Sequence, residues 1–120
     1  MTSRMQYTRQ LDKLVKIAVM ERCQGRCFIC GRQACDPAHL LEKSVFPSLR
    51  FDMDNIQGLC RTCHSSDHTG TGIYLKAWIR RFGQEAYDAL RAKGRQTASM
   101  TTAEIKDKIK LVKTGAHLLH

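Results

Sequence analysis

The residues best suited to chemistry in this sequence are two Cys-x-x-Cys pairs, Cys27/Cys30 and Cys60/Cys63. Two such pairs can converge on one tetrahedral zinc ion, and four thiolates complete a structural site of this kind. The alternative is four unrelated buried thiols, but the two-residue spacing within both pairs favours zinc. Nearby histidines are then left for other chemistry, because a structural zinc site closes at four ligands.

Two further cysteines, Cys23 and Cys35, do not belong to this pattern. Cys23 could in principle replace Cys27. The context Cys27-x-x-Cys30-Gly31 favours the first assignment, because glycine permits the tight turn of a zinc knuckle. We interpret Cys23 and Cys35 as small apolar residues or free thiols.

A hydrolytic centre is suggested by His39, His64 and His68, with Asn55 between them in the sequence. On a helix, His64 and His68 share a face and could bind one ion, because side chains four residues apart are neighbours. His39, on an expected strand, could polarise a water molecule as a general base, while a divalent ion stabilises the phosphate and the leaving 3′-oxygen. In isolation His39 would be a satisfied core histidine, but its position between the cysteine pairs favours the catalytic interpretation.

The composition places these residues in a small, basic protein. Its 120 residues carry a formal net charge of +9, which is typical either of a solvated surface or of a protein that binds nucleic acid. No apolar run is long enough to cross a membrane, and the first residues lack the core of a signal peptide. We therefore expect a cytoplasmic protein, in which close cysteine pairs favour metal over disulfides.

A basic amphipathic helix is predicted over residues 4–21. Its apolar residues form one stripe at the spacing of a helix face, which consists of Leu11, Leu14, Val15 and Ala18. The stripe could be part of the core or the seam of a homodimer.

The remaining elements are predicted from strand, turn and capping signals. A strand is expected over 34–41, weakened by Pro37, and a short helix is expected from about Arg61. Thr101 and Glu104 have the spacing of a capping box. Three later helices, each with the glycine expected to end it, are 73–82 (Gly83), 84–93 (Gly94, as a left-handed cap) and 99–112 (Gly115).

The order of His39, Asn55 and His64 within two cysteine pairs resembles the HNH endonucleases, in the branch that carries four zinc-binding cysteines. The resemblance implies an α+β fold with a small zinc-stapled treble-clef, ββα-metal (His-Me finger) core and flanking helices. It also implies that His39 is the general base and that Asn55 is structural, holding the loop between the strands. His64 would bind the catalytic metal.

Longer segments resemble the phage NinG family of recombination endonucleases, also called Rap. The similar segments span about residues 26–93 and include Cys27–Gly31, Asp36–His39, Leu49–Gln57, Cys60–Cys63 and Ile79–Ala86. The resemblance implies a phage- or prophage-encoded enzyme in a bacterial host. Such an enzyme would cleave branched recombination intermediates, Holliday junctions or D-loops, with Mg²⁺ or Mn²⁺.

The ligands that complete the catalytic metal site are left open by the sequence. Many HNH proteins have a metal-binding residue directly before the base histidine, where this chain has Ala38. Asp36 is the expected substitute, but residues i and i−3 of a strand point to opposite faces, so Pro37 would have to bend the segment. His68 is either a second ligand, a phosphate contact or a solvent-exposed residue.

Basic residues near the motif could contact DNA phosphates, which position DNA without reading its sequence. The candidates are Arg50, Arg61, Lys76, Arg80 and Arg81. Taken singly, each is interpreted first as a solvated charge. The lysine-rich C-terminal helix is either a solvated face or a second DNA-binding arm.

The sequence therefore predicts a metal-dependent DNA endonuclease in three segments. Residues 1–22 would be an N-terminal amphipathic helix, 23–95 the zinc-bound HNH nuclease domain, and 96–120 a C-terminal basic helix and tail. One alternative, motivated by Ala38, is a non-catalytic treble-clef module that binds nucleic acid or protein. Another is a nickase used in phage DNA packaging or restriction. Branched DNA is the expected partner, with no membrane and with a homodimer as a possible assembly.

Overall fold

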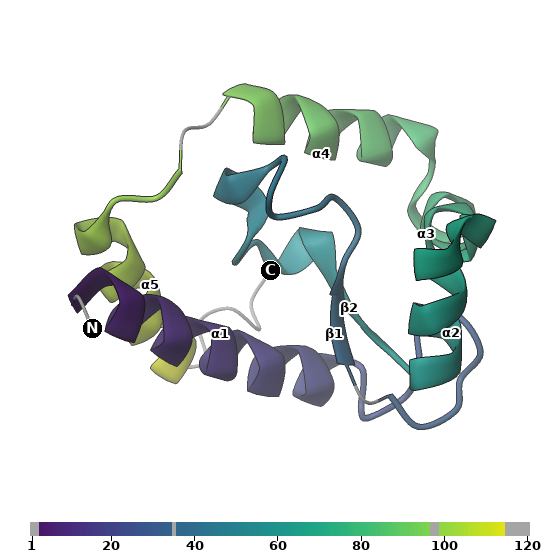
Figure 1. Cartoon of the computed structure of the whole chain (residues 1–120), viewed down its shortest axis with the longest axis horizontal. Helices are drawn as coiled ribbons and strands as arrows, with labels where there is room; N and C mark the ends of the chain where they lie inside the picture. The colour runs from purple at the N-terminus through teal and green to yellow at the C-terminus, as the bar shows by residue number, and fades with distance from the viewer. Residues whose placement is uncertain (1–2, 35, 97–98, 115–120) are drawn as a thin grey trace.

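The structure, a computed structural model, describes residues 3–34, 36–96 and 99–114. Its helices surround one short pair of strands (Figure 1). In chain order the elements are α1 (Ser3–Arg22), β1 (Asp36–His39), η1 (Pro47–Leu49), η2 (Met53–Asn55), β2 (Ile56–Leu59), α2 (Arg61–Ser66), η3 (Asp67–Thr71), α3 (Ile73–Phe82), α4 (Gln84–Gln96) and α5 (Thr102–Lys113). The predicted α+β class is confirmed. Within the described ranges, no helix is long and apolar enough to cross a membrane.

The two strands form an antiparallel pair in which His39 lies opposite Ile56 and Ala38 lies opposite Gln57. Residues directly opposite one another share a face, so His39 and Ile56 lie on one face and Ala38 and Gln57 on the other. β1 is shorter than the predicted strand at both ends. Pro37 is accommodated within β1 because both strands of a two-stranded sheet are edge strands.

Each face of the strand pair supports a separate apolar cluster. On the face of Ala38, the first cluster includes Tyr74 and Trp78 of α3, which are 1% and 4% exposed. The Tyr74 hydroxyl donates a hydrogen bond to the carbonyl of Ala38 at 2.8 Å, which ties α3 to β1. On the other face, Ile56 joins the second cluster with α1 and α5. The strands therefore separate two small cores that are built from different helices.

The apolar stripe of α1 packs inside the molecule, where α1 and α5 lie side by side (Figure 1). Leu11, Val15 and Ala18 are buried in one cluster with Ile105 and Ile109 of α5. The stripe is therefore core, and its burial leaves no dimer seam there. The predicted capping box at the start of α5 is confirmed, since both of its reciprocal hydrogen bonds are present.

The predicted end of the fourth helix at Gly94 is wrong. α4 continues past Gly94, which is buried against the connection between the strands. A Cβ atom here would lie 2.7 Å from both Leu49 Cδ1 and Phe46 Cδ1, so glycine permits a close approach instead of a left-handed cap. Gly83, with φ 97°, does end α3 as predicted. The helix end predicted at Gly115 lies outside the described residues.

Gly94→Ala is expected to lower the free energy of unfolding by about 1–3 kcal/mol through overpacking. At an open helix position the same change would stabilise, because alanine is the better helix former by about 1 kcal/mol. Urea unfolding followed by circular dichroism measures the difference. The control is Ala92→Gly, at an exposed position of α4, which should cost about 1 kcal/mol through propensity alone. A Gly94→Ala variant as stable as wild type would contradict the close packing.

Candidate metal centre and histidine site

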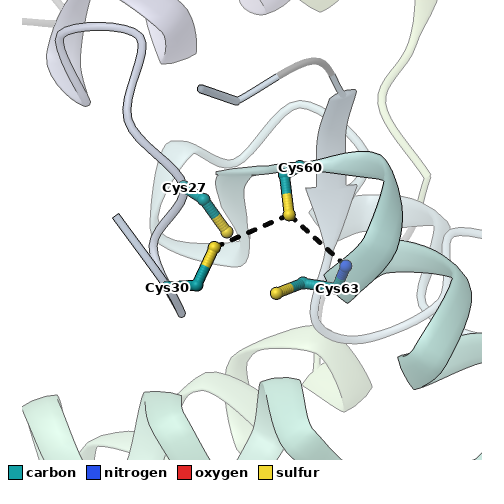
Figure 2. A group of neighbouring side chains, drawn as sticks. All are labelled: Cys27, Cys30, Cys60 and Cys63. Carbon is teal, nitrogen blue, oxygen red and sulfur yellow. Dashed lines mark hydrogen bonds between the residues drawn. The ribbon is translucent and has the colours of Figure 1, made fainter. Parts of the chain in front are cut away.

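Four cysteine sulfur atoms converge between the loop after α1 and the start of α2 (Figure 2). The Sγ atoms of Cys27, Cys30, Cys60 and Cys63 all lie within 4.8 Å of one another, and those of Cys30 and Cys60 are 3.7 Å apart. Gly31 has φ 75° and permits the turn after the first pair. The cluster is placed to bind one metal ion through four thiolates and is consistent with the predicted structural zinc.

Cys23, one of the two cysteines outside the Cys-x-x-Cys pairs, lies outside this cluster. Cys23 is half-buried, with its Sγ 3.5 Å from the carbonyl oxygen of Met20, and a Cβ atom on Gly58 would lie only 2.9 Å from that sulfur. Cys27 therefore keeps the ligand position that the sequence assigned to it. Cys35 lies outside the described residues.

Close packing in this cluster moves the pKa values of Cys27 and Cys63 in opposite directions. Burial opposes ionisation of Cys27, but backbone hydrogen bonds from Cys30 and Cys60 outweigh it and lower the pKa of Cys27 to about 7. Burial raises the pKa of Cys63 well above its ordinary value, and hydrogen bonds with the neighbouring thiols raise it further. A divalent cation would supply the charge that lets all four ionise, and its binding would release the remaining protons.

Asn55 holds the long connection between the two strands. Its side chain is fully buried, and its Oδ1 accepts a hydrogen bond from the backbone N–H of Leu41 at 2.8 Å. Its Nδ2 donates to the carbonyl oxygens of Leu41 at 3.0 Å and Leu49 at 3.2 Å. All three partners are backbone groups, so this side chain fixes the loop that follows His39.

His39 is oriented by a backbone carbonyl. Its Nε2 lies 2.7 Å from the carbonyl oxygen of Arg50, which can only accept, so Nε2 carries the proton and Nδ1 keeps a lone pair. Burial lowers the pKa of His39, and the charges of Lys43 and Arg50 lower it further, against the opposing effects of that hydrogen bond and of Asp12. The ring is therefore neutral near pH 7 and can accept a proton.

Arg50 is itself fixed by the first helix. Its guanidinium donates two hydrogen bonds to the Asp12 carboxylate of α1, at 2.7 Å and 3.2 Å. The side chain is thus paired with an acid, and its backbone carbonyl positions His39. We predicted Arg50 as a phosphate contact; in this structure its charge is already balanced by Asp12.

His64 lies between a carboxylate and a second imidazole. Its Nδ1 is 3.1 Å from Asp36 Oδ2, and its Nε2 is 3.1 Å from Nε2 of His68. An ionised carboxylate can only accept, so Nδ1 carries a proton, and in the neutral ring Nε2 then keeps its lone pair. This is the tautomer that binds a metal through Nε2 while a carboxylate orients the ring. Asp36 and His68 therefore flank opposite nitrogens of the same ring.

The three histidines His39, His64 and His68 line one cavity of about 680 Å³. Pro37 and Ile56, on the same face of the strand pair as His39, form part of its wall. The basic residues at this cavity are Lys13, Lys16, Lys43 and Arg50. No motif in the sequence places these lysines at the site. Helical periodicity locates Lys13 and Lys16 on α1, but only the packing of α1 beside β1 brings them to the histidines.

The other predicted DNA contacts lie on α2 and α3. The Arg61 side chain is 80% exposed, and its Nε is 3.9 Å from Asp36 Oδ1, beside His64. Lys76, Arg80 and Arg81 are exposed on α3 and are outside the histidine cavity. Arg61 therefore lies beside the histidines, whereas the three α3 residues lie away from them.

These features define a small α+β protein with a four-cysteine metal site and a separate histidine-lined cavity. The family model described as bacteriophage lambda NinG protein matches residues 1–120, and the chain belongs to this family. The match includes α1 and α5, which lie beyond the segments whose resemblance was read from the sequence. No curated protein and no solved structure matches the chain.

Proposed function

We propose that this protein is a metal-dependent DNA endonuclease that hydrolyses phosphodiester bonds in branched DNA, such as Holliday junctions or D-loops. The observation that carries the proposal is the position of His39, His64 and His68 around one basic cavity. Membership of the NinG family and the HNH-like order of His39, Asn55 and His64 support it. The zinc in this proposal is structural, because four cysteines leave no open coordination position.

His39 is the proposed general base. The carbonyl of Arg50 holds its Nε2–H, so Nδ1 can take the proton of a water molecule as that water attacks the phosphorus. The lowered pKa keeps the ring neutral, which is the form a base requires. The Asp12–Arg50 pair is a positioning contact, because it steadies the carbonyl that orients the ring.

His64 and His68 are the proposed ligands of the catalytic ion. Their Nε2 atoms face each other, and the tautomer of His64 offers a lone pair there. In this arrangement Asp36 is a positioning residue that orients His64 from its other nitrogen. When bound, a divalent ion stabilises the negative charge on the phosphate and the leaving 3′-oxygen. Two imidazole donors favour Mn²⁺ over Mg²⁺, which prefers oxygen ligands.

The lysines around the cavity are the proposed phosphate contacts. Lys13 and Lys16 extend from α1, and Lys43 extends from the connection between the strands. Such contacts hold the backbone without selecting a sequence. We infer that α1 contributes to the site both through these charges and through Asp12.

The proposed function is tested by cleavage of a labelled four-way junction and of a linear duplex of matched sequence, with and without Mn²⁺. Metal-dependent cleavage with preference for the junction is the expected result. Equal cleavage of both substrates would contradict selectivity for branches and favour a nickase in packaging or restriction. If neither substrate is cut and calorimetry detects no ion beyond the zinc, the protein is a non-catalytic binding module.

The pH dependence of cleavage should report the titration of His39. Because its folded pKa is lowered, the neutral base persists below the ordinary histidine value of about 6.5. The rate is therefore expected to fall only at lower pH, as His39 becomes protonated. The measurement is a pH–rate profile at saturating Mn²⁺, which limits the contribution of proton competition at His64 and His68. A midpoint above 6.5 would contradict the assigned environment of His39.

A further inference from the structure

A second cavity has a volume of about 870 Å³. It lies between the segment from the end of α1 to Gly31 on one side and the helices α3 and α4 on the other. Gln57 lines it from the face of the strand pair opposite His39 and Ile56, so it is distinct from the histidine cavity. Its volume is within the range of about 300–1,000 Å³ that is usual for small-molecule sites. The cavity plays no part in the chemistry proposed for the histidines.

Aromatic rings form one wall of this second cavity. Phe28 and Phe82 are stacked, with their ring centroids 5.9 Å apart and their planes at 12° to each other. The ring centroids of Trp78 and Phe82 are 4.8 Å apart. Phe82 is 45% exposed although it is large and apolar. The buried indole N–H of Trp78 has no hydrogen-bond partner among the described residues. The wall therefore offers apolar ring surface beside an unsatisfied donor.

The charges at this cavity favour an anionic ligand. Four basic side chains and one acidic side chain line it, and the residues are Arg22, Arg26, Arg81, Lys93 and Asp54. Lys93 is paired with Asp52 at 2.6 Å, so the excess of positive charge rests on the three arginines. The guanidinium of Arg81 lies over the rings of Phe28 and Phe82, at 5.7 Å and 5.8 Å from their centroids. The guanidinium of Arg22 donates to the carbonyl oxygens of Met53 and Ile56, which fix its position without cancelling its charge.

We propose that this second cavity binds an unpaired nucleotide of DNA, with the base against the aromatic wall and the phosphate among the guanidinium groups. The inference rests on the proposed function, in which DNA is the substrate. Bases within a duplex have both faces covered by their neighbours, so only an unpaired base can stack on a protein ring. Such a site recognises DNA structure and tolerates any sequence, which would favour branched substrates over linear duplex.

Trp78 is the only tryptophan of the chain, so its fluorescence reports directly on this cavity. The test is titration with an oligothymidylate of about ten nucleotides, without added divalent cation so that no cleavage occurs. We expect saturable quenching of Trp78, with at least about tenfold weaker binding of a duplex of equal length. Unchanged emission, while the anisotropy of a labelled oligonucleotide shows binding, would overturn the proposal. Equal binding of duplex and single strand would overturn it as well.

Two variants make the test specific for this cavity. Arg81 and Phe82 are both exposed, and neither is a buried member of an apolar cluster. Phe82→Ala and Arg81→Ala are each expected to weaken oligothymidylate binding about tenfold, on the scale of one base–aromatic stack. Arg95→Ala removes the same charge from an exposed position of α4 outside the cavity and should have a much smaller effect. Equal losses for Arg81→Ala and Arg95→Ala would show general electrostatics and contradict a specific site. Thermal melts confirm that each variant is folded.

Failure of this inference can be separated from failure of the proposed function. His39→Ala should bind oligothymidylate as wild type does, because His39 lies on the other face of the strands. Junction cleavage by a protein whose Trp78 fluorescence ignores single strands would reject the cavity and retain the nuclease. Specific quenching by a protein that never cuts DNA would retain the cavity and reject the nuclease.

Discussion

His39→Ala is expected to reduce junction cleavage by at least about 100-fold, the lower range for loss of a general base. The reason is that His39 lines the histidine cavity, and its Nδ1 keeps the lone pair because Nε2–H is held by the Arg50 carbonyl. Single-turnover cleavage at saturating Mn²⁺ measures the effect on the chemical step. Zinc content and circular dichroism should match those of wild type.

The control for this result is His39→Gln. The glutamine amide can still donate to the Arg50 carbonyl, but it cannot accept the proton of water. Equal losses in the two variants would assign the effect to proton transfer and not to the position of the loop. Wild-type cleavage by His39→Ala would contradict the assignment of the base.

Loss of the zinc is expected to unfold the protein, whether by a strong chelator or by Cys63→Ser. Structural zinc binds with an apparent free energy of about 10–16 kcal/mol in small domains, whereas a whole domain is stable by only about 5–15 kcal/mol. The two apolar clusters of this chain are small, so the ion that joins the loop after α1 to α2 should be essential. Thermal denaturation and zinc stoichiometry measure the outcome.

Cys23→Ser is the matched control for the zinc prediction. Cys23 lies outside the cluster of four sulfur atoms, so this variant should keep one zinc per chain and melt near the wild-type temperature. A Cys63→Ser variant that retained both the zinc and the melting temperature would contradict the four-cysteine site.

Local patterns predicted much of the fold. The spacing within the two cysteine pairs identified the members of the metal cluster, because backbone turns of that length bring two thiols to adjacent corners of a tetrahedron. Helical periodicity located α1 and α3, and the glycine at position 83 located the end of α3. Periodicity could not say what the stripe of α1 contacts, since a core and a dimer seam require the same apolar pattern.

Gly94 shows why the same kind of signal can mislead. A glycine near a helix end predicts a left-handed cap, but here it permits Leu49 and Phe46 to approach the backbone of α4. A glycine that caps a helix and a glycine that permits close packing look the same in the sequence. Only the path of the connection between the strands distinguishes them.

The sequence by itself determined which residues could do chemistry: four cysteines for one metal, and three histidines for the proposed hydrolytic centre. It did so because ligand identity and short-range spacing are local properties of a chain. The tertiary structure decided how the histidines are arranged and which groups each one contacts. The position of Asp36 at Nδ1 of His64, and of His68 at Nε2, assigns the tautomer and the nitrogen that would face the proposed ion. The packing of α1 also pairs Arg50 with Asp12 and brings Lys13 and Lys16 to the cavity. These contacts join residues distant in sequence, so no local pattern could reveal them.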